Sequence, residues 1–283
     1  MWAKSSATLY IIVLSGLLGQ HAIAGPIRND TLVPLQSDGP PLKQVSISNP
    51  GGGKGIYPSA ANTTENTGKP RNIGVVAFPG WQPLDIMGPL DALWGLSIKA
   101  PINLYFLNDK PGTTSNFLPG TTLPGSKVAA VVNVDYTFDK APPLDVLLVP
   151  GGMGTRAPEA ALAPHIKFVK DTYPSLKYII SVCTGASILG RAGILDGKQA
   201  TTNKAAWDFA TQWGKNVKWQ PSARYVHDGN VWSTSGVSAG TDGVIAWIGS
   251  VWGDQVATKI ANEMEWSLSP ADGDKFGKLY GRY

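Results

Sequence analysis

Short apolar segments that alternate with segments of helical character place the strongest constraint on the fold of this chain. Five mostly apolar segments are expected strands: 73–78, 102–107, 128–134, 146–149 and 178–182. Helices are expected at 89–96, 164–173, 184–192, 239–251 and 255–267. Apolar strands that alternate with helices form a mostly parallel sheet, covered by helices on both faces. The pattern therefore predicts an α/β fold.

One departure from parallel pairing is expected near the C-terminal third of the chain. Asp228-Gly229 is a dipeptide typical of tight hairpin turns, and it is flanked by short segments at 224–226 and 231–234. An antiparallel pair is predicted there.

Composition narrows the class of protein. The chain has 283 residues, of which 43% are hydrophobic and 16% charged, a balance typical of globular proteins. The net charge is only +4 and the basic residues are scattered. Because phosphate recognition needs a clustered basic face, no nucleic-acid partner is expected.

The N-terminal residues indicate export. Lys4 precedes an uncharged, mostly apolar segment at 7–19, and Ala22-Ile23-Ala24 has the small-x-small pattern of a cleavage site. A stable membrane anchor is disfavoured, since a spanning helix needs about 20 apolar residues. We therefore expect a signal peptide at 1–24 and a secreted protein.

The next residues have the composition of a linker. Segment 25–70 is rich in Pro, Gly, Ser and Thr and contains two glycosylation sequons, at Asn29 and Asn62, which are common by chance and often unused. We divide the chain into signal peptide 1–24, flexible linker 25–70, folded domain 71–268 and a loosely held tail, 269–283.

Cys183 is the only cysteine of the chain. A single cysteine forms no disulfide within the chain, although disulfides are common in secreted proteins. It stands where the expected strand 178–182 meets an expected helix, with the small residues Thr184 and Gly185 after it. That arrangement is typical of a nucleophile elbow, and a helix N-terminus lowers the pKa of a nearby thiol. The alternative is a buried, inert cysteine that packs as a small hydrophobe.

Pro150-Gly151-Gly152 follows another core strand at the same expected edge of the sheet. Glycines leave backbone amides open to a ligand, so Gly151 and Gly152, together with the amide of Thr184, are candidate donors of an oxyanion hole. An ordinary strand-ending turn is the equal alternative.

A nucleophile usually has a partner that handles protons. Two histidines of the expected mature chain, His165 and His227, fall in segments where a solvated surface position is expected. Asp85 is a better candidate, because it follows the first strand and so lies at the same sheet edge, although helix capping or turn formation explains it at least as well. Trp81 is close enough in sequence to line a pocket there.

Gly236-Val237-Ser238-Ala239-Gly240 matches the serine-hydrolase elbow G-x-S-x-G. In that fold the histidine follows the serine, but the last histidine here is His227. Ser238 is therefore expected to cap a helix instead. No P-loop, no dinucleotide-binding motif and no metal-site spacing is found in the sequence, so a metal site is not expected.

At these residues the chain resembles the ThiJ/PfpI superfamily, relatives of the class I glutamine amidotransferases, and within it the isonitrile (isocyanide) hydratase branch. The order and spacing of the motifs hold over 71–268. The segments that carry the resemblance are 78–80, 84–85, 88–89, 145–152, 181–185, 192–198, 200–202 and 228–230.

The resemblance implies a flavodoxin-like three-layer α/β sandwich, a homodimer and no cofactor. The catalytic residues that it implies are Cys183, Asp85 and Thr184. Many members have Thr-Thr-His-Trp where this chain has Thr-Thr-Asn203-Lys204, so a cysteine–histidine dyad at that place is unavailable.

The expected activity is cysteine-dependent hydration of a small isonitrile to an N-substituted formamide. Two alternatives stay open. One is another cysteine-dependent hydrolase, lyase or deglycase of the same superfamily. The other is a non-enzymatic protein, in which the thiol senses oxidants or the fold binds a small ligand.

Overall fold

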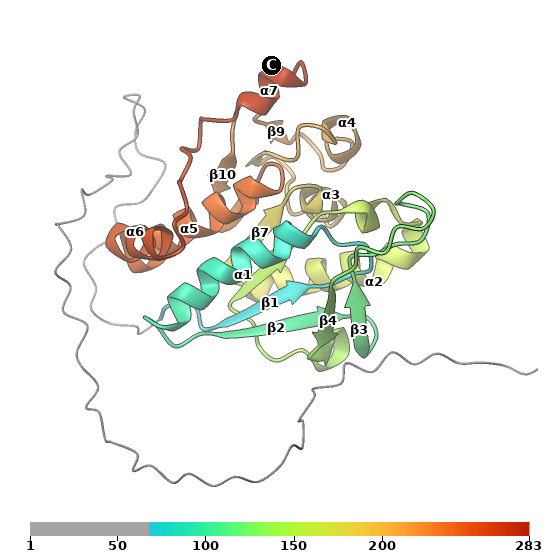
Figure 1. Ribbon diagram of the computed structural model, residues 1–283, viewed down its shortest axis with the longest axis horizontal. Helices are drawn as coiled ribbons and strands as arrows, with labels where there is room; N and C mark the ends of the chain where they lie inside the picture. Colours follow the sequence, from blue (N-terminus) through green and yellow to red (C-terminus); the bar gives the residue numbers. More distant parts are fainter. Residues whose placement is uncertain (1–67, 283) are drawn as a thin grey trace, which may run out of the picture. The chain divides into compact units, whose positions relative to one another are not determined.

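The computed structural model describes residues 68–282 (Figure 1). The expected signal peptide, nearly all of the expected linker, and the sequons at Asn29 and Asn62 lie outside the described residues.

Seven strands of the described part form one sheet, in the order β10-β11-β7-β6-β1-β2-β5. All neighbouring strands are parallel except β10 and β11, which form an antiparallel hairpin around Gly229. The strands are β1 (Asn72–Val76), β2 (Asn103–Asn108), β5 (Tyr136–Thr137), β6 (Val146–Val149), β7 (Tyr178–Val182), β10 (Tyr225–Asp228) and β11 (Val231–Thr234). The mostly parallel sheet and the hairpin confirm the predicted architecture.

Helices cover both faces of this sheet. On one face, α1 (Pro83–Ser97) packs beside α5 (Ser238–Trp252), and α6 (Asp254–Glu263) packs against both (Figure 1). On the other face, α2 (Glu159–Thr172) packs against α3 (Gly185–Arg191), which lies on β6 and β7. Apolar side chains of β1, β6 and β7 fill the space between the layers, which makes them the centre of the core.

The remaining elements within residues 68–282 are short. Two small sheets pair β3 (Gly112–Ser115) with β4 (Val131–Val134) and β8 (Gln199–Ala200) with β9 (Lys218–Trp219). The short helices are α4 (Trp207–Ala210), α7 (Lys275–Leu279) and three single-turn 3-10 helices at Phe138–Lys140, Met153–Arg156 and Tyr173–Ser175. The expected strand at 128–134 is thus shorter, and it lies outside the main sheet.

The two helices that contain an internal proline begin earlier than expected. Helix α1 begins at Pro83 and contains Pro89, and α2 begins at Glu159 and contains Pro164. A proline in the first turn of a helix removes no backbone hydrogen bond, whereas a proline further inside the helix does. The sequence therefore predicts a helix start near each of these prolines. The correction places Asp85 inside the first turn of α1.

The expected C-terminal tail, 269–283, contacts the domain at several described residues. Helix α7 begins after Asp274, whose side chain accepts a hydrogen bond from the N–H of Phe276, and Asp274 itself is buried. Gly277 packs closely against the backbone of Pro221. Among the described residues, no helix is long and apolar enough to cross a membrane.

Candidate active site

Cys183 occupies a sharp turn between β7 and α3. Its φ of 57° lies in the left-handed region, which residues other than glycine adopt rarely and at a cost of roughly 1–3 kcal/mol. The turn is tight, because a Cβ on the following Gly185 would lie 2.2 Å from the carbonyl oxygen of Val149. The structure therefore has the backbone geometry of a nucleophile elbow, as predicted from the sequence.

The backbone of the elbow is held from two sides. The N–H of Cys183 donates to the carbonyl oxygens of Ser235, at 3.0 Å, and Thr234, at 3.2 Å. On the other side, the hydroxyl of Thr202 donates to the carbonyl oxygen of Cys183 over 2.9 Å. These contacts hold the strained conformation in place.

The carboxyl group of Asp85 is fully buried beside this cysteine. Its Oδ2 accepts the N–H of Gly151 at 2.8 Å, and Oδ1 has no conventional hydrogen bond in the described structure. Burial raises the pKa of Asp85 to about 7, against the lowering effects of the Gly151 N–H and the Cys183 thiol. Asp85 is therefore a carboxyl group that gains and loses a proton near neutral pH, and it caps no helix.

Cys183 is buried, with 6% of the residue exposed. Burial and the negative charge of Asp85 raise the pKa of Cys183, and they outweigh the N–H groups of Thr184 and Val237 and the Thr184 hydroxyl, which lower it. The expectation of a lowered thiol pKa is thus wrong. The helix N-terminus is present, but desolvation and a buried carboxyl group outweigh it.

Thr184 and the two glycines form a small buried network. The N–H of Gly152 donates to the Thr184 hydroxyl oxygen at 3.0 Å, and the hydroxyl of Thr155 lies 3.0 Å from the same oxygen. A Cβ on Gly151 would lie only 2.5 Å from the nitrogen of Thr184. The amides of Gly151 and Gly152 thus hold Asp85 and Thr184, and their contact with a substrate stays a prediction.

Trp81 lies in the turn between β1 and α1 and is buried. Its backbone carbonyl carbon would be 2.8 Å from a Cβ on Gly152, so the two segments are in close contact. The indole Nε1 has no hydrogen-bond partner among the described residues. Trp81 supports the loop of the site, and its role in lining a substrate pocket stays a prediction.

The histidines lie elsewhere. His165 is buried, contrary to the expectation of a surface position, because it packs edge-on against Phe78 and Phe138 while its Nε2 pairs with Asn108 Oδ1 at 2.8 Å. His227 stacks on Trp232 in the hairpin. At the place of the family's histidine, Asn203 accepts the N–H of Ala206 through its side chain.

The Gly236–Gly240 motif begins α5, as predicted, but Ser238 is its first helical residue and not its cap. The N-cap position is Val237, which makes no side-chain capping bond. Sequence reasoning missed Val237 as a site residue because its contribution is a backbone N–H next to the Cys183 thiol. No side-chain pattern encodes such a contact.

A cavity of about 210 Å³ lies next to the elbow. The residues that line it include Val237, Lys204 and Phe276, so the cavity lies between the start of α5 and helix α7. Among the described residues, no group of three or more His, Cys, Asp or Glu side chains is arranged to hold a metal ion.

Comparisons with known proteins find relatives of this chain. The model of the DJ-1/PfpI family matches residues 72–248. An isonitrile hydratase from Pseudomonas putida is 32% identical over 199 residues, which cover 70% of this chain and 79% of that protein. A deglycase from Pyrococcus horikoshii is 37% identical over 112 residues, 38% of this chain and 63% of that protein.

Among solved structures, a ThiJ/PfpI family protein from Pseudomonas syringae superposes with a TM-score of 0.60 at 26% sequence identity. The match covers 76% of this chain and 86% of that one.

Proposed function

This chain belongs to the DJ-1/PfpI family, and on that premise we propose that it is a cysteine-dependent hydratase that converts a small isonitrile into an N-substituted formamide. The observation that carries the proposal is the pairing of the Cys183 thiol with a buried Asp85 whose pKa is about 7. The similarity to an isonitrile hydratase over most of the domain supports the same reaction.

The first half of the reaction uses this pair to add the thiol across the terminal carbon. Asp85 accepts the thiol proton as the sulfur attacks the isonitrile carbon, and the new C–S bond leaves electron density on that carbon. The protonated Asp85 then returns the proton to the same carbon as a general acid. The product is a thioimidate, and Asp85 is again ionised.

The second half consumes one water. Asp85 accepts a proton from the water as its oxygen attacks the thioimidate carbon, and the substrate nitrogen then takes a proton from Asp85. Collapse of the tetrahedral adduct breaks the C–S bond, and the hydroxyl proton passes through Asp85 to the sulfur. One isonitrile and one water thus give one formamide and the free thiol.

Thr184 has a supporting role in this scheme. Its hydroxyl is held by the Gly152 N–H, and its backbone N–H contributes to stabilising charge on the Cys183 sulfur. We assign Thr184 to orienting the attacking water. Gly151, which donates to Asp85 Oδ2, leaves Oδ1 to exchange protons with the sulfur and the substrate.

Formamide production from cyclohexyl isocyanide by the wild type, Cys183→Ala and Asp85→Asn tests the proposal. We expect turnover by the wild type, none by Cys183→Ala, and binding with a rate reduced at least about 100-fold for Asp85→Asn. Ile260→Val, a conservative change in the core of α6, serves as a matched control that keeps full activity. Formamide formation that survives the loss of Cys183 would overturn the proposal.

Deglycation is the second candidate, favoured by the similarity to a deglycase over part of the chain. Both activities would use the Cys183 thiol as the nucleophile, and they differ in the electrophile that it attacks. Turnover of a panel of glycated thiols and amines, compared with turnover of an isonitrile, therefore separates deglycation from hydration. Oxidant sensing has less support. Sensor thiols are accessible and have a low pKa, whereas the Cys183 thiol is buried and its pKa is raised.

We also propose that the protein is exported and that Asn29 and Asn62 are glycosylated, on the sequence pattern alone. The protein is expected in the culture medium of the organism that produces it, and N-terminal sequencing of that protein is expected to give Gly25 as the first residue. A mobility shift after enzymatic removal of N-glycans is the expected sign of glycosylation.

A further inference from the structure

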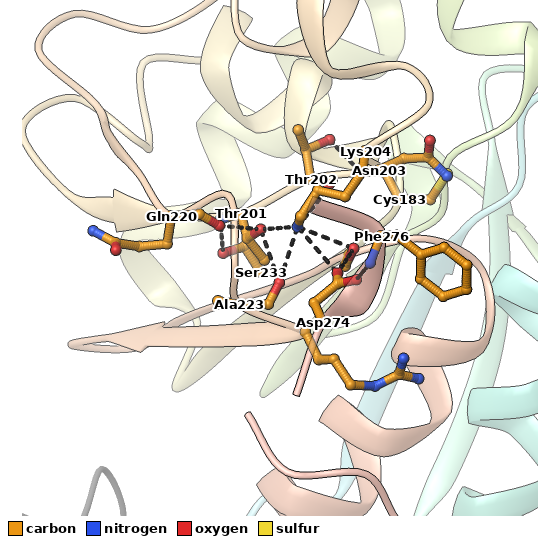
Figure 2. Close-up of polar contacts among 12 residues, drawn as sticks. Cys183, Thr201, Thr202, Asn203, Lys204, Gln220, Ala223, Ser233, Asp274 and Phe276 are labelled. Carbon is orange, nitrogen blue, oxygen red and sulfur yellow. Dashed lines mark hydrogen bonds and ion pairs between the residues drawn. The ribbon is translucent and has the colours of Figure 1, made fainter. Parts of the chain in front are cut away.

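A lysine is buried next to the elbow, in the position that follows Asn203. Lys204 is 2% exposed, and the three protons of its Nζ are shared among four protein oxygens within hydrogen-bond distance (Figure 2). They are Thr201 Oγ1 at 2.6 Å, Ala223 O at 2.9 Å, Thr202 O at 3.1 Å and Ser235 Oγ at 3.1 Å. A buried ammonium group with so many partners has a fixed position.

The charge of Lys204 is balanced from the C-terminal segment. Asp274 Oδ2 lies 3.3 Å from Nζ, and both side chains are about 1% exposed. The same Oδ2 accepts a hydrogen bond from the Ser235 hydroxyl at 2.6 Å. Oδ1 accepts the N–H of Phe276, which lies beside Asp274 in Figure 2. Asp274 lies beyond residues 72–248, to which the family model extends. The ion pair is therefore a feature of this chain that the family match does not cover.

Two of the residues bound by Lys204 also hold Cys183. The carbonyl oxygen of Thr202 accepts a hydrogen bond from Nζ, and the hydroxyl of Thr202 donates one to the carbonyl oxygen of Cys183. The hydroxyl oxygen of Ser235 accepts a hydrogen bond from Nζ, and the carbonyl oxygen of Ser235 accepts one from the N–H of Cys183. The ammonium thus joins the two segments that fix the strained elbow from opposite sides.

A contribution to stability is a weak explanation for this pair. Taking two charges out of water is costly, and a buried ion pair often stabilises a protein no more than well-packed apolar residues would. Burial lowers the pKa of Lys204 to about 8 despite the opposing effect of Asp274, with the charge of Arg224 lowering it further. Because the free-energy cost of burying these two charges is not explained by stability, it indicates that the pair fixes the positions of the residues around it.

We propose that Lys204, held by Asp274, is a positioning residue that fixes the Cys183 elbow through Thr202 and Ser235, so that the thiol faces Asp85. The C-terminal segment thereby becomes part of the active site's support. The inference rests on the proposed function where it concerns turnover, but the position of the thiol is measured without a substrate.

The test uses the full chain carrying Lys204→Met together with Asp274→Asn, which removes both charges and leaves neither unpaired. Formamide turnover and the alkylation of Cys183 by iodoacetamide at pH 8 are measured. We expect kcat to fall about tenfold or more with little change in KM, because a displaced nucleophile reacts more slowly while binding persists. Alkylation is expected to slow by a similar factor, because the resting thiol is neutral and a displaced thiol can no longer pass its proton to Asp85 as the sulfur attacks.

Ser235→Ala is the second variant. It leaves the charges of Lys204 and Asp274 in place but removes the hydroxyl through which both residues contact the segment that holds the elbow. A smaller decrease in kcat and in the alkylation rate is therefore expected. It keeps the inference testable if the double variant does not fold. Ile260→Ala, in the core of α6, is the matched control for general destabilisation, and its kcat and alkylation rate are expected to stay at the wild-type values.

Unchanged kcat and alkylation in a folded double variant would overturn the inference, as would faster alkylation, which indicates general opening of the fold. If Ser235→Ala is the only variant that folds, wild-type values for it would overturn the inference as well. If the wild type makes no formamide, the proposed function fails, while the alkylation rates still decide the role of Lys204.

Discussion

Cys183 and Asp85 form a pair that works as one unit, because each changes the proton affinity of the other. Burial and the negative charge of Asp85 hold the thiol neutral, while the pKa of Asp85 is raised to about 7. The proposed reaction needs one proton on the pair, which is present above the pKa of Asp85 and below that of the thiol. The reactive state is thus populated at neutral pH and above, without a thiolate in the resting protein.

The first prediction concerns the pH dependence of activity. Because Asp85 must be ionised to take the thiol proton, kcat/KM for cyclohexyl isocyanide is expected to rise with pH through about pH 7 and then to level off. Assays between pH 5 and pH 9 measure this rise. Asp85→Asn is expected to abolish it together with most of the activity, and a flat profile for the wild type would contradict the role of Asp85.

A second prediction at the residue scale concerns stability. The pKa of Asp85 is raised from 3.8 to about 7 on folding, so the folded state binds the extra proton between these values. The contribution of Asp85 to stability is therefore expected to fall as pH rises from about 4 to 7, by at most about 1.4 kcal/mol per unit of pKa difference. Urea unfolding at pH 4.5 and pH 8 measures it.

Asp85→Asn carries no titrating group at this position. Its stability relative to the wild type is expected to be greater at pH 8 than at pH 4.5. Ile260→Ala, a change in an apolar part of the core, provides the control, because its loss of stability is expected to be the same at both pH values. An Asp85→Asn difference that does not change with pH would contradict a raised pKa.

At the scale of elements, the site depends on how closely the loops after β1, β6 and β7 approach one another. Gly151 is the clearest case, since a Cβ there would lie 2.5 Å from the nitrogen of Thr184 and 3.0 Å from Asp85 Oδ2. The first of these neighbours is backbone, which cannot turn away. We expect Gly151→Ala to move the loop apart from the elbow.

Gly151→Ala is therefore expected to lower kcat by about 100-fold, the effect of a displacement of roughly 1 Å, and to cost about 1–3 kcal/mol of stability through overpacking. Enzyme assays and urea unfolding measure the two effects. Gly253→Ala is the control: Gly253 has a φ of 101° but no atom within 4 Å of an added Cβ. It is expected to lose stability through backbone strain alone and to keep its activity.

The sequence predicts the central elements well and their surroundings less well, for physical reasons. Strands β6 and β7 have the predicted bounds, because an apolar segment between turn residues has one favourable place in a parallel sheet. The starts of α1 and α2 are misplaced, because an internal proline resembles a first-turn proline in sequence. Strands β8 and β9, with two residues each, carry no periodic pattern that would reveal them.

The same contrast holds for the site as a whole. Cys183 is identifiable from the sequence because its position between strand and helix is a local property. The charge state of its thiol is not, because it results from burial and from Asp85, a residue about 100 positions earlier. Lys204 and Asp274 likewise meet only through the folded structure, and their neighbours in sequence give no sign of the pairing.

At the scale of the whole molecule, two ion pairs among residues 68–282 connect the C-terminal segment to the rest of the domain. Asp274 pairs with Lys204 in the interior, whereas Arg282 pairs with Asp208 at the surface, where the side chains are 27% and 75% exposed. Removing one partner of a buried pair leaves an uncompensated charge and costs roughly 3–5 kcal/mol, while a surface pair contributes about 0–1 kcal/mol. The two pairs therefore provide a matched comparison within one segment.

The last prediction is that Asp274→Ala destabilises the protein by several times more than Arg282→Ala, measured by urea unfolding at pH 7. The loss is expected to shrink as pH rises to about 8 and then to level off, because without Asp274 the pKa of the buried Lys204 falls below its wild-type value of about 8, so the folded variant has released the lysine proton where the folded wild type still binds it. Folding then releases a proton and becomes more favourable with rising pH. Equal losses for the two variants, independent of pH, would mean that surface contacts rather than the buried charge hold α7 in place.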